Sequence, residues 1–463
     1  MNNKACAVIL AGGQGKRMHS DLPKPMFEVL GVPMIDWVMD SCKKSGIEDI
    51  CVVTGFNHEV LEAHLGDSVT TVVQEERRGT GHAVMIASEW LKGHAGSDVI
   101  VLNGDAPFID SETVMAALWA HRDNGNDVTV ITAEIEKPFG YGRILRKGDS
   151  LTGIVEEKDA TEEQKSIHEI NSGAYWFKTD RLLETLGKLT PNNAQGEYYL
   201  TDTIYILLSE GHKAGAYRSP NPDVVLGAND RKGLLMLNDI ARKNVLLSQL
   251  DNGVEIACSD GITIGKNVRI GRGTKILQGS IITGDTVIGE NCVIGPNCLI
   301  ENTEVGDGTV LNSVQSHESK VGKNVQIGPF VQLRPGTVID DGVKIGDFVE
   351  IKNSKIGANT AVAHLTYVGD SDVGRGVNFG CGVAVANYDG ENKFRTVIGD
   401  NAFIGCNTNL VAPVRVGNAA YTGAGSTITK DVPDGALAVE RASEKLIEDF
   451  GTKRLAKRIA KNS

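Results

Sequence analysis

The sequence predicts two unlike halves, an α/β domain built on a mainly parallel sheet and, after it, a parallel β-helix. The first half alternates strand-like apolar runs with stretches at helical spacing, which is typical of a sheet covered by helices. The second half places an aliphatic residue at every sixth position, which indicates a hexapeptide β-helix. A chain of 463 residues is long enough for each half to bury a core of its own.

The composition excludes several classes of protein. The formal net charge of -12 argues against a nucleic-acid binder, because nonspecific affinity for a phosphate backbone needs clustered cations. No apolar run approaches about 18 residues, so we expect no membrane-spanning helix. The first residues lack the pattern of a secretory signal, and we therefore expect a cytoplasmic protein. The 8 cysteines form no CxxC pair and fit buried thiols better than disulfides or zinc ligands.

Residues 1–228 form the predicted α/β domain. Its strand-like runs are ACAVIL, DICVVTG, SDVIVLNGD and DVTVITAEI, and helical spacing is found at 33–45 and 81–91. A further stretch with helical spacing fills 229–250 and stops at Asn252-Gly253. A glycine directly after helical spacing is typical of a helix end, so this stretch predicts a helix that links the two halves.

Residues 251–437 form the predicted β-helix. One inward aliphatic residue per six supplies one wall of a prism, and a following Gly or Asn can adopt the positive φ of a tight corner. Three walls make a turn of about 18 residues. The period breaks at about 301–320, 357–368 and 386–397, and the last break, ANYDGENKFRT, is polar enough to predict a loop ejected from the rod. The repeated positions are Ile264, Ile270, Ile276, Ile282, Ile288, Ile294 and Ile300, then Val321, Ile327, Leu333, Ile339, Ile345 and Ile351, then Ile398, Ile404, Leu410, Val416, Thr422 and Ile428.

The last residues, 438–463, form a separate basic tail. It carries Arg454, Lys457, Arg458 and Lys461. This pattern fits a solvated basic helix or a frayed terminus.

A glycine-rich turn follows the first strand-like run. It reads Leu10-Ala11-Gly12-Gly13-Gln14-Gly15-Lys16-Arg17, and Pro23-Lys24-Pro25 comes shortly after it. Backbone N–H groups in such a turn can approach phosphate oxygens, and Arg17 and Lys24 could neutralise the charge. The spacing fits neither a Walker A loop nor the GxGxxG fingerprint. A plain tight turn is the alternative, but the two cations favour a nucleotide phosphate site.

Polar residues mark two further candidate sites. Asn103-Gly104-Asp105 ends an apolar run, where a carboxylate at the carboxyl edge of a parallel sheet is well placed for a ligand. A turn-capping Asp is the alternative.

In the β-helix, cations and one histidine suit a phosphate-bearing amine substrate. Histidine is easily tuned to act as a base near neutral pH, although a lone histidine is more often structural. These residues are Arg334, Lys352, His364, Tyr367, Asn378, Asn387 and Tyr388.

Three features together resemble one family over about residues 3–455: the glycine-rich loop with Pro-Lys, the hexapeptide rod, and AHLTYVGD followed by ANYDG. The family is that of the bacterial bifunctional N-acetylglucosamine-1-phosphate uridylyltransferases/glucosamine-1-phosphate acetyltransferases. The resemblance implies a Rossmann-like nucleotidyltransferase domain and a left-handed β-helix that forms a homotrimer with acetyl sites between subunits. It also implies acetyl transfer from acetyl-CoA to glucosamine-1-phosphate. The N-acetylglucosamine-1-phosphate so formed would attack UTP, release pyrophosphate and supply UDP-N-acetylglucosamine for peptidoglycan and lipopolysaccharide precursors.

The resemblance assigns residues of the first half. Asp105 and Asn229, two oxygen ligands, would hold Mg²⁺, and Arg17 and Lys24 would act on the phosphates. The pyrimidine base would meet Gln74, Gly79 and Thr80, and the sugar would meet Gly142, Glu156 and Asn171. The full set implied for UTP and UDP-N-acetylglucosamine is Leu10, Ala11, Gly12, Gly13, Lys24, Gln74, Gly79, Thr80, Asn103, Gly104, Asp105, Gly142, Glu156, Asn171 and Asn229.

The resemblance assigns residues of the second half in the same way. His364 would be the base that takes a proton from the 2-amine of the sugar, and Glu350 would orient it. The amino-sugar phosphate would be bound by Arg334, Lys352, Tyr367 and Asn378. Acetyl-CoA would contact Asn387, Tyr388, Cys406, Ala424 and Arg441.

The chain departs from the family pattern at three positions. Lys16 stands where Thr is frequent, Asn103 where an aromatic is frequent, and Cys406 where the family uses Ser, which leaves only a weak hydrogen-bond donor.

Two other functions compete with the bifunctional one. One is a single-activity sugar-1-phosphate nucleotidyltransferase with a structural or regulatory rod, and the other is a non-catalytic assembly subunit like the translation-factor relatives. His364 and the 386–397 loop argue against the first, and Arg17, Lys24, Asp105 and Asn229 against the second.

Overall fold

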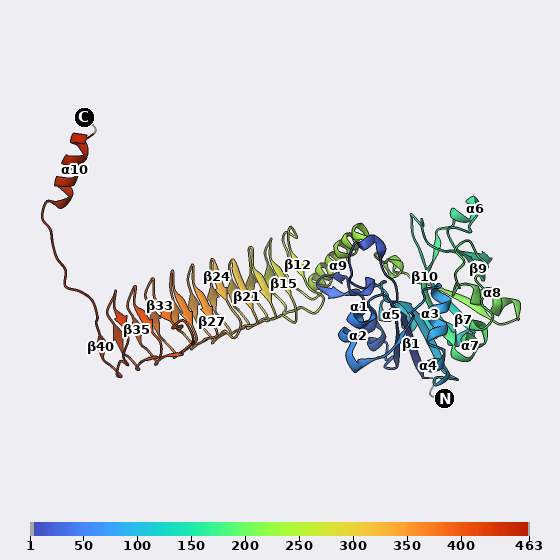
Figure 1. Ribbon diagram of the computed structural model, residues 1–463, viewed down its shortest axis with the longest axis horizontal. Helices are drawn as coiled ribbons and strands as arrows, with labels where there is room; N and C mark the ends of the chain where they lie inside the picture. The colour runs from blue at the N-terminus through green and yellow to red at the C-terminus, as the bar shows by residue number, and fades with distance from the viewer. Residues whose placement is uncertain (1–3, 462–463) are drawn as a thin grey trace. The chain divides into compact units, whose positions relative to one another are not determined.

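The computed structural model describes residues 4–461, and its chain divides into two compact units between Asn244 and Val245 (Figure 1). The first unit is the α/β domain and the second contains the β-helix. Across the described residues, every helix is too short or too polar to cross a membrane.

A nine-stranded mixed sheet forms the middle of the first unit, with the central order β11-β7-β10-β6-β1-β4-β5. β1, β4, β5 and β6 run parallel, as predicted, but β10 runs antiparallel between β6 and β7. The hairpin of β8 and β9 joins the sheet through β10. The strands are β1 Ala5–Leu10, β4 Ile50–Thr54, β5 Thr70–Val73, β6 Asp98–Asn103, β7 Val128–Glu134, β8 Arg143–Lys147, β9 Ser150–Val155, β10 Glu169–Lys178 and β11 Ala214–Arg218, with the small pair β2 Glu28–Val29 and β3 Val32–Pro33 outside the sheet.

Helices and helical turns connect these strands and cover the sheet (Figure 1). They are α1 Met34–Lys44, α2 His58–Leu65, α3 Thr80–Ile86, α4 Ser88–Lys92, α5 Ser111–Asp123, α6 Glu162–Lys165, α7 Thr179–Leu186 and α8 Asp202–Ser209, with 3-10 turns at Lys16–Met18, Lys24–Met26, Gly66–Ser68 and Pro222–Val225. The helix expected at 81–91 is therefore two short helices. The linking helix expected at 229–250 corresponds to α9 Arg231–Asp251, in which the boundary between the two units falls.

The sheet of the first unit is buried on both faces, as the continuous apolar runs require. Along β1, Ala7 and Ile9 belong to one core cluster, and Cys6 and Val8 belong to the other. Because successive side chains of a strand point to opposite faces, this alternation places one core on each side of the sheet. The carboxyl ends of β1 and β6 consequently emerge from a rigid, fully packed layer.

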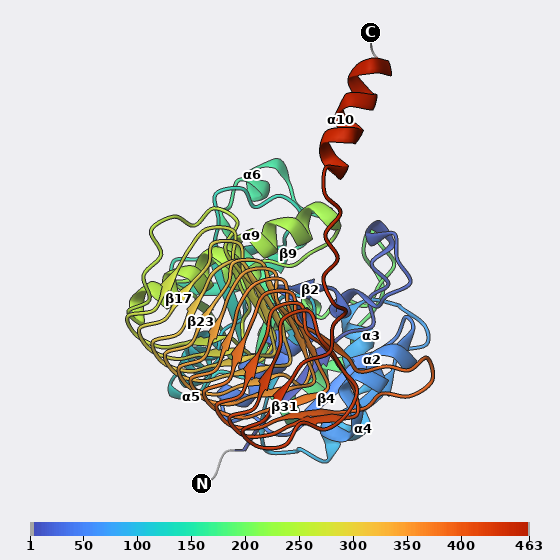
Figure 2. The same cartoon turned by 90° about the vertical axis from the view of Figure 1, so that its left-hand side faces the viewer.

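The second unit is a left-handed parallel β-helix whose coils stack in register, and its end-on view shows its three walls (Figure 2). Wall 1 contains β12 Thr263–Ile264, β15 Ile281–Thr283, β18 Leu299–Glu301, β21 Val314–His317, β24 Val331–Leu333, β27 Glu350–Lys352, β30 Tyr367–Gly369, β33 Ala384–Ala386, β36 Asn409–Val411 and β39 Thr427–Ile428. Wall 2 contains β13 Arg269–Ile270, β16 Val287–Ile288, β19 Glu304–Val305, β22 Lys320–Val321, β25 Val338–Ile339, β28 Lys355–Ile356, β31 Ser371–Val373, β34 Thr396–Ile398 and β37 Val414–Val416. Wall 3 contains β14 Lys275–Ile276, β17 Val293–Ile294, β20 Val310–Leu311, β23 Gln326–Ile327, β26 Lys344–Ile345, β29 Ala361–Val362, β32 Asn378–Phe379, β35 Phe403–Ile404, β38 Tyr421–Thr422 and β40 Leu437–Ala438.

The predicted aliphatic ladder fills the interior of the rod. Ile264, Ile282 and Ile300 are each 0% exposed and lie in register in successive coils, 18 residues apart. The two residue types expected at the corners have separate roles. Asn291 adopts positive φ (55°), whereas a Cβ on Gly271 would lie 2.5 Å from the carbonyl carbon of Gly289 in the next coil. The glycines that follow an isoleucine thus allow close approach of coils, and the corner asparagines supply the left-handed turn.

The three expected interruptions differ in kind. At 301–320 and 357–368 the coils stay stacked and only become shorter, since Ile300 pairs with Ser316 and Ile345 pairs with Val362. At 386–397 the chain leaves the rod between β33 and β34, so the register there steps from Val373 to Ile398. Only this third break is a loop ejected from the prism. The tail beyond β40 contains α10 Phe450–Lys461, whose residues are all exposed.

Candidate active sites

Two adjoining cavities open at the carboxyl ends of β1 and β6. One, of about 290 Å³, is lined by the glycine-rich loop, Lys24, Gln74, Gly79 and Thr80 among others. The other, of about 260 Å³, is lined by Gly142, Glu156, Asn171 and Asn229 among others. The residues that line both are Leu10, Thr80, Asn103 and Asp105. The cavities therefore form one cleft, and Asp105 lies where its two parts meet.

The glycine-rich loop comes very close to its neighbours. A Cβ on Gly12 would lie 3.1 Å from Oε1 of Gln74, and a Cβ on Gly55 would lie 2.8 Å from the Cα of Gly12. Gly79 has φ of 103°, and a Cβ there would lie 2.5 Å from the carbonyl oxygen of Tyr198. Glycine at these positions therefore allows the backbone beside the first cavity to pack closely against its neighbours.

Lys24 joins the two predicted metal ligands. Its ammonium forms an ion pair with Asp105 and donates to Oδ1 of Asn229 at 2.8 Å. Lys24 and Asp105 are only 13% and 25% exposed in their side chains, so the charge pair is largely shielded from water. The chain thus places one carboxylate and one amide oxygen around a single cationic group.

These oxygens also suit a divalent cation. Mg²⁺ takes oxygen ligands and is commonly held by one or two protein groups plus substrate phosphates and water. The ammonium of Lys24 shows that Asp105 and Asn229 can converge on one positive charge. Within residues 4–461 no cluster of three or more His, Cys, Asp or Glu side chains could hold a metal by itself. The donor set therefore fits a metal that is shared with phosphate oxygens.

The second cavity holds a half-buried carboxylate. Burial raises the pKa of Glu156, and the nearby charges of Asp159 and Asp202 add to the effect. The hydroxyl of Thr201 donates to Glu156 at 3.3 Å. On β10, the side-chain amide of Asn171 donates to the hydroxyl of Tyr175 at 2.6 Å. These groups offer both hydrogen-bond acceptors and donors, as a sugar with several hydroxyls requires.

Two predicted residues lie outside the lining of both cavities. Arg17 is exposed in the 3-10 turn Lys16–Met18. The pKa of Asp230 is lowered mainly by the hydrogen bond from the N–H of Gly233, and the positive charge of Arg17 adds a smaller effect. Gly104 is buried, and its N–H donates to the carbonyl oxygen of Leu10 at 2.9 Å. Gly104 thereby joins the ends of β6 and β1, which is a structural contribution to the cleft.

Sequence reasoning missed several residues of this cleft. Nε2 of Gln74 donates to Nδ1 of His82 at 3.0 Å, and Arg77, Glu197, Tyr175 and Thr201 contribute to the lining. Arg, Glu and Thr side chains are usually exposed on a surface, and Tyr175 is a buried residue of an apolar strand. Only their position next to the glycine-rich loop and β10 marks them as site residues.

In the β-helix, His364 belongs to a column of equivalent corner residues. The corner between walls 3 and 1, here called corner A, contains the residue two positions after each inward side chain of wall 3. The ring Nδ1 of His364 contacts the carboxylate of Asp347, the equivalent residue one coil earlier, and this hydrogen bond lowers the pKa of Asp347. The column is Asp347, His364, Cys381, Cys406 and Ala424.

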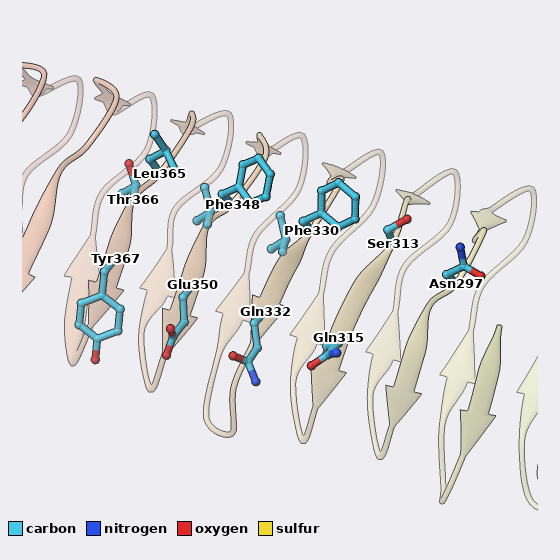
Figure 3. A pocket seen from close by; sticks show the side chains of 12 residues that line it. Asn297, Ser313, Gln315, Phe330, Gln332, Phe348, Glu350, Leu365, Thr366 and Tyr367 are labelled. Carbon is cyan, nitrogen blue, oxygen red and sulfur yellow. The ribbon is translucent and has the colours of Figure 1, made fainter. Parts of the chain in front are cut away.

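Glu350 has a different partner from the one expected. Its carboxylate accepts a hydrogen bond from Nη1 of Arg334 at 2.8 Å. On wall 1, Glu350 of β27 pairs in register with Tyr367 of β30. In this chain Asp347, and not Glu350, contacts the ring of His364, and the orienting role of Glu350 stays a prediction. A cavity of about 640 Å³ lies over this wall and corner A, lined by Glu350, Tyr367 and the stacked rings of Phe330 and Phe348 (Figure 3).

The corner between walls 1 and 2, here called corner B, carries paired ammonium groups. Contact with Lys393, and also the charge of Arg334, lowers the pKa of Lys352. Burial opposes the ionisation of Asp370, but hydrogen bonds from Asn353 and Asn387 outweigh it, so its pKa is lowered. Lys393 lies in the ejected loop and was missed from the sequence, although it is a cation in the most polar interruption of the ladder.

The remaining predicted residues lie on separate parts of the rod. Cys406 and Ala424 are on corner A, where Arg441 donates to the carbonyl oxygen of Ala424 at 3.0 Å. Asn387 and Tyr388 begin the loop at corner B, and Asn378 lies on wall 3. One chain therefore presents the predicted acetyl-transfer residues on two walls and two corners instead of in one cavity.

Comparisons with known proteins agree with this two-part description. Residues 6–222 match the nucleotidyl transferase family, and residues 267–302, 318–353 and 395–430 match the bacterial transferase hexapeptide repeats. The chain is 47% identical to the bifunctional protein GlmU of Acetivibrio thermocellus over 449 residues, covering 97% of each chain. It is 48% identical to that of Thermoanaerobacter pseudethanolicus and 46% identical to that of Clostridium acetobutylicum, each over 451 residues that cover 97% of this chain and 98% of the relative.

These matches extend over both halves of the chain, as the resemblance of the glycine-rich loop, the rod and the AHLTYVGD motif implied. The chain belongs to the family of the bifunctional GlmU proteins and is an enzyme with a nucleotidyltransferase half and an acetyltransferase-type half.

Proposed function

We propose that this chain makes UDP-N-acetylglucosamine in two steps, first acetylating glucosamine-1-phosphate and then transferring uridylyl from UTP to the product. The observation that carries the proposal is the position of Asp105, at the junction of a glycine-lined cavity and a cavity with sugar-type hydrogen-bonding groups. Both substrates, UTP and acetyl-CoA, belong to the cytoplasm, where we place the enzyme. Its product would supply peptidoglycan and lipopolysaccharide precursors.

In the uridylyl step the sugar supplies its own nucleophile. A phosphate oxygen of N-acetylglucosamine-1-phosphate attacks the α-phosphorus of UTP, a new P–O bond forms, and pyrophosphate leaves. Such a transfer depends on in-line positioning and charge neutralisation. The glycine-rich loop would hold the nucleotide phosphates, and Glu156 and Asn171 would hold the sugar on the other side of Asp105.

Asp105 and Asn229 would hold a Mg²⁺ ion shared with the phosphates. The metal would neutralise charge on the reacting phosphate oxygens when it is bound. Lys24 would then exchange its contacts with Asp105 and Asn229 for the phosphates of UTP. We also assign Arg17 to the phosphates, since it carries a positive charge close to the loop and its present position is exposed.

In the acetyl step His364 would act as the base. Asp347 contacts Nδ1, which leaves Nε2 to take a proton from the 2-amine of the sugar as that amine attacks the acetyl thioester. The C–N bond forms, the C–S bond breaks, and coenzyme A leaves as the thiol. Arg334, Lys352 and Lys393 would bind the sugar phosphate, because cations held together favour a dianion.

The acetyl site would be completed by neighbouring copies in a homotrimer. On one chain, Asn378 on wall 3, Lys352 near corner B and His364 on corner A face different directions. The cavity beside corner A is bordered by Phe330, Phe348 and Leu365, each of which follows a corner A position, and these side chains are 61%, 55% and 63% exposed (Figure 3). Large apolar side chains at this level of exposure are typical of a surface that another protein covers.

The proposal is tested by supplying the purified enzyme with glucosamine-1-phosphate, acetyl-CoA, UTP and Mg²⁺ and measuring free thiol and pyrophosphate separately. We expect thiol release without UTP, and pyrophosphate release only after acetylation or when N-acetylglucosamine-1-phosphate is added directly. A chain that releases pyrophosphate from N-acetylglucosamine-1-phosphate but never releases thiol would be a single-activity nucleotidyltransferase with a structural rod.

A further inference from the structure

Corner A places two cysteines next to each other in neighbouring coils. Phe379 of wall 3 pairs in register with Ile404, so Cys381 and Cys406, each two residues further on, are equivalent. Backbone hydrogen bonds hold this register on both sides of the pair. The N–H of Gly380 donates to the carbonyl oxygen of Ile404 at 2.7 Å, and the N–H of Asn407 donates to the carbonyl oxygen of Cys381 at 2.8 Å.

The spacing of the coils puts the Cα atoms of these cysteines in the range that a disulfide allows, and bond formation would also bring their Cβ atoms to about 3.5–4.5 Å. Neighbouring strands of a parallel sheet lie about 4.8 Å apart, and a disulfide needs Cα atoms about 4.4–6.8 Å apart. The thiol of Cys406 also leans towards the coil of Cys381, since a Cβ on Gly380 would lie 2.8 Å from Sγ of Cys406. Both side chains reach solvent, because Cys406 is exposed and Cys381 is half-buried.

The other cysteines differ in accessibility. Cys6, Cys42, Cys51, Cys292 and Cys298 are buried, and burial raises the pKa of each thiol, to about 12 for Cys6, Cys42 and Cys51. Cys258 is exposed but lies before the first strand of wall 1. Among the described residues, corner A is thus where two solvent-accessible thiols occupy equivalent positions in adjacent coils.

We propose that Cys381 and Cys406 form a reversible disulfide that switches acetyl transfer off. The pair continues the column of Asp347 and His364, and Ala424 follows it. Joining the two sulfurs would draw the side chain of Cys406 away from acetyl-CoA, which the family resemblance places at this residue, and would tie the coil beside His364 to the next one. This consequence rests on the proposed acetyltransferase function, whereas formation of the disulfide does not.

The oxidant is a low-molecular-weight disulfide such as glutathione disulfide. One protein thiolate attacks it, giving a mixed disulfide and one released thiol. The second protein thiolate then attacks the mixed disulfide, so the protein S–S bond forms and a second thiol leaves. The two cysteines lose two electrons and two protons, and the small disulfide gains them. Excess dithiothreitol reverses the reaction in the same two steps.

The test treats the full-length protein with glutathione disulfide and maps its peptides without reduction. We expect a cross-link between the peptides that contain Cys381 and Cys406, and a loss of two titratable thiols. Thiol release from acetyl-CoA, measured after the oxidant or the reductant has been removed, should fall at least tenfold on oxidation and return after dithiothreitol treatment, while pyrophosphate release from UTP stays unchanged. Cys381→Ser should have the same acetyl-transfer activity as the unaltered chain with its thiols reduced, and this activity should resist the oxidant. Cys258→Ser, the matched control, should respond like the unaltered chain.

Several results would overturn the proposal. A peptide map that shows only glutathione on single cysteines, or links between two chains, rejects the disulfide. Full cross-linking with unchanged thiol release rejects the switch. A reduced protein with no thiol release at all contradicts the proposed acetyltransferase function, and in that case the peptide map still decides whether Cys381 and Cys406 pair.

Discussion

His364 contacts Asp347, and the two residues occupy the same corner position in successive coils of the rod. A carboxylate on Nδ1 keeps the ring in one orientation and leaves Nε2 to act as the base. The orientation of the ring thus follows from the stacking of the β-helix itself.

Asp347→Asn should therefore lower kcat for acetyl transfer roughly ten- to a hundredfold, because the ring loses its charged hydrogen-bond acceptor. The effect is measured as thiol release at saturating substrates, and pyrophosphate release should stay unchanged. Glu350→Gln is the comparison: since Glu350 contacts Arg334, we expect it to raise KM for the sugar phosphate more than it lowers kcat. A larger loss of kcat in Glu350→Gln than in Asp347→Asn would return the orienting role to Glu350.

Lys393→Ala should raise KM for glucosamine-1-phosphate about tenfold, since it removes one of two adjacent ammonium groups that favour a dianionic phosphate. Steady-state kinetics of acetyl transfer measures the change, and kcat should move less than KM. Lys430→Ala, which removes another exposed lysine of the same unit, serves as the control. Equal effects of the two substitutions would show that Lys393 acts only through the net charge of the rod.

Binding of N-acetylglucosamine-1-phosphate should weaken at acidic pH. Burial raises the pKa of Glu156, so this carboxylate gains its proton at a higher pH than an ordinary glutamate and then loses an acceptor for sugar hydroxyls. KM in the uridylyl step should accordingly rise as the pH falls through that pKa. Glu156→Gln should have a high KM at every pH, and a KM in Glu156→Gln that keeps the original pH dependence would assign the titration to another group.

The inward ladder should carry much of the stability of the rod. Ile282 is fully buried and its neighbour Ile281 is 41% exposed on the same strand. Replacing Ile282 by Ala should cost about 2–5 kcal/mol of unfolding free energy, because it removes buried methyl groups and leaves a cavity. Ile281→Ala should cost less than about 1 kcal/mol. Denaturant unfolding followed by circular dichroism measures both, and similar losses would mean that the two side chains are equally buried in solution.

The fold was predictable wherever a short period is repeated. A six-residue ladder specifies which side chains point inward, and Ile264, Ile282 and Ile300 stack accordingly. The lengths of individual coils were not predictable, because a coil can lose a corner residue and still bury the same aliphatic positions. The shortened coils at 301–320 and 357–368 therefore appeared as breaks in the period. The antiparallel course of β10 was equally hidden, since an apolar strand has the same pattern in either direction.

The sequence motifs identified most of the site residues, but they predicted fewer of the contacts between those residues. Lys24, Asp105 and Asn229 come together as the resemblance implied, although more than 200 residues separate Lys24 from Asn229. The partner of His364 depends on coil length: Asp347 is 17 residues earlier, which equals the step from Ile345 to Val362. A uniform period of 18 would not have selected Asp347. Lys393 was hidden because a loop outside the ladder has no register.

The central claim is that the two activities reside in separate halves of the chain. It is tested most directly by measuring thiol release and pyrophosphate release side by side in Asp105→Ala and His364→Ala. We predict that Asp105→Ala loses pyrophosphate release and keeps thiol release, and that His364→Ala shows the reverse. Parallel loss of both activities in either properly folded variant would contradict the claim.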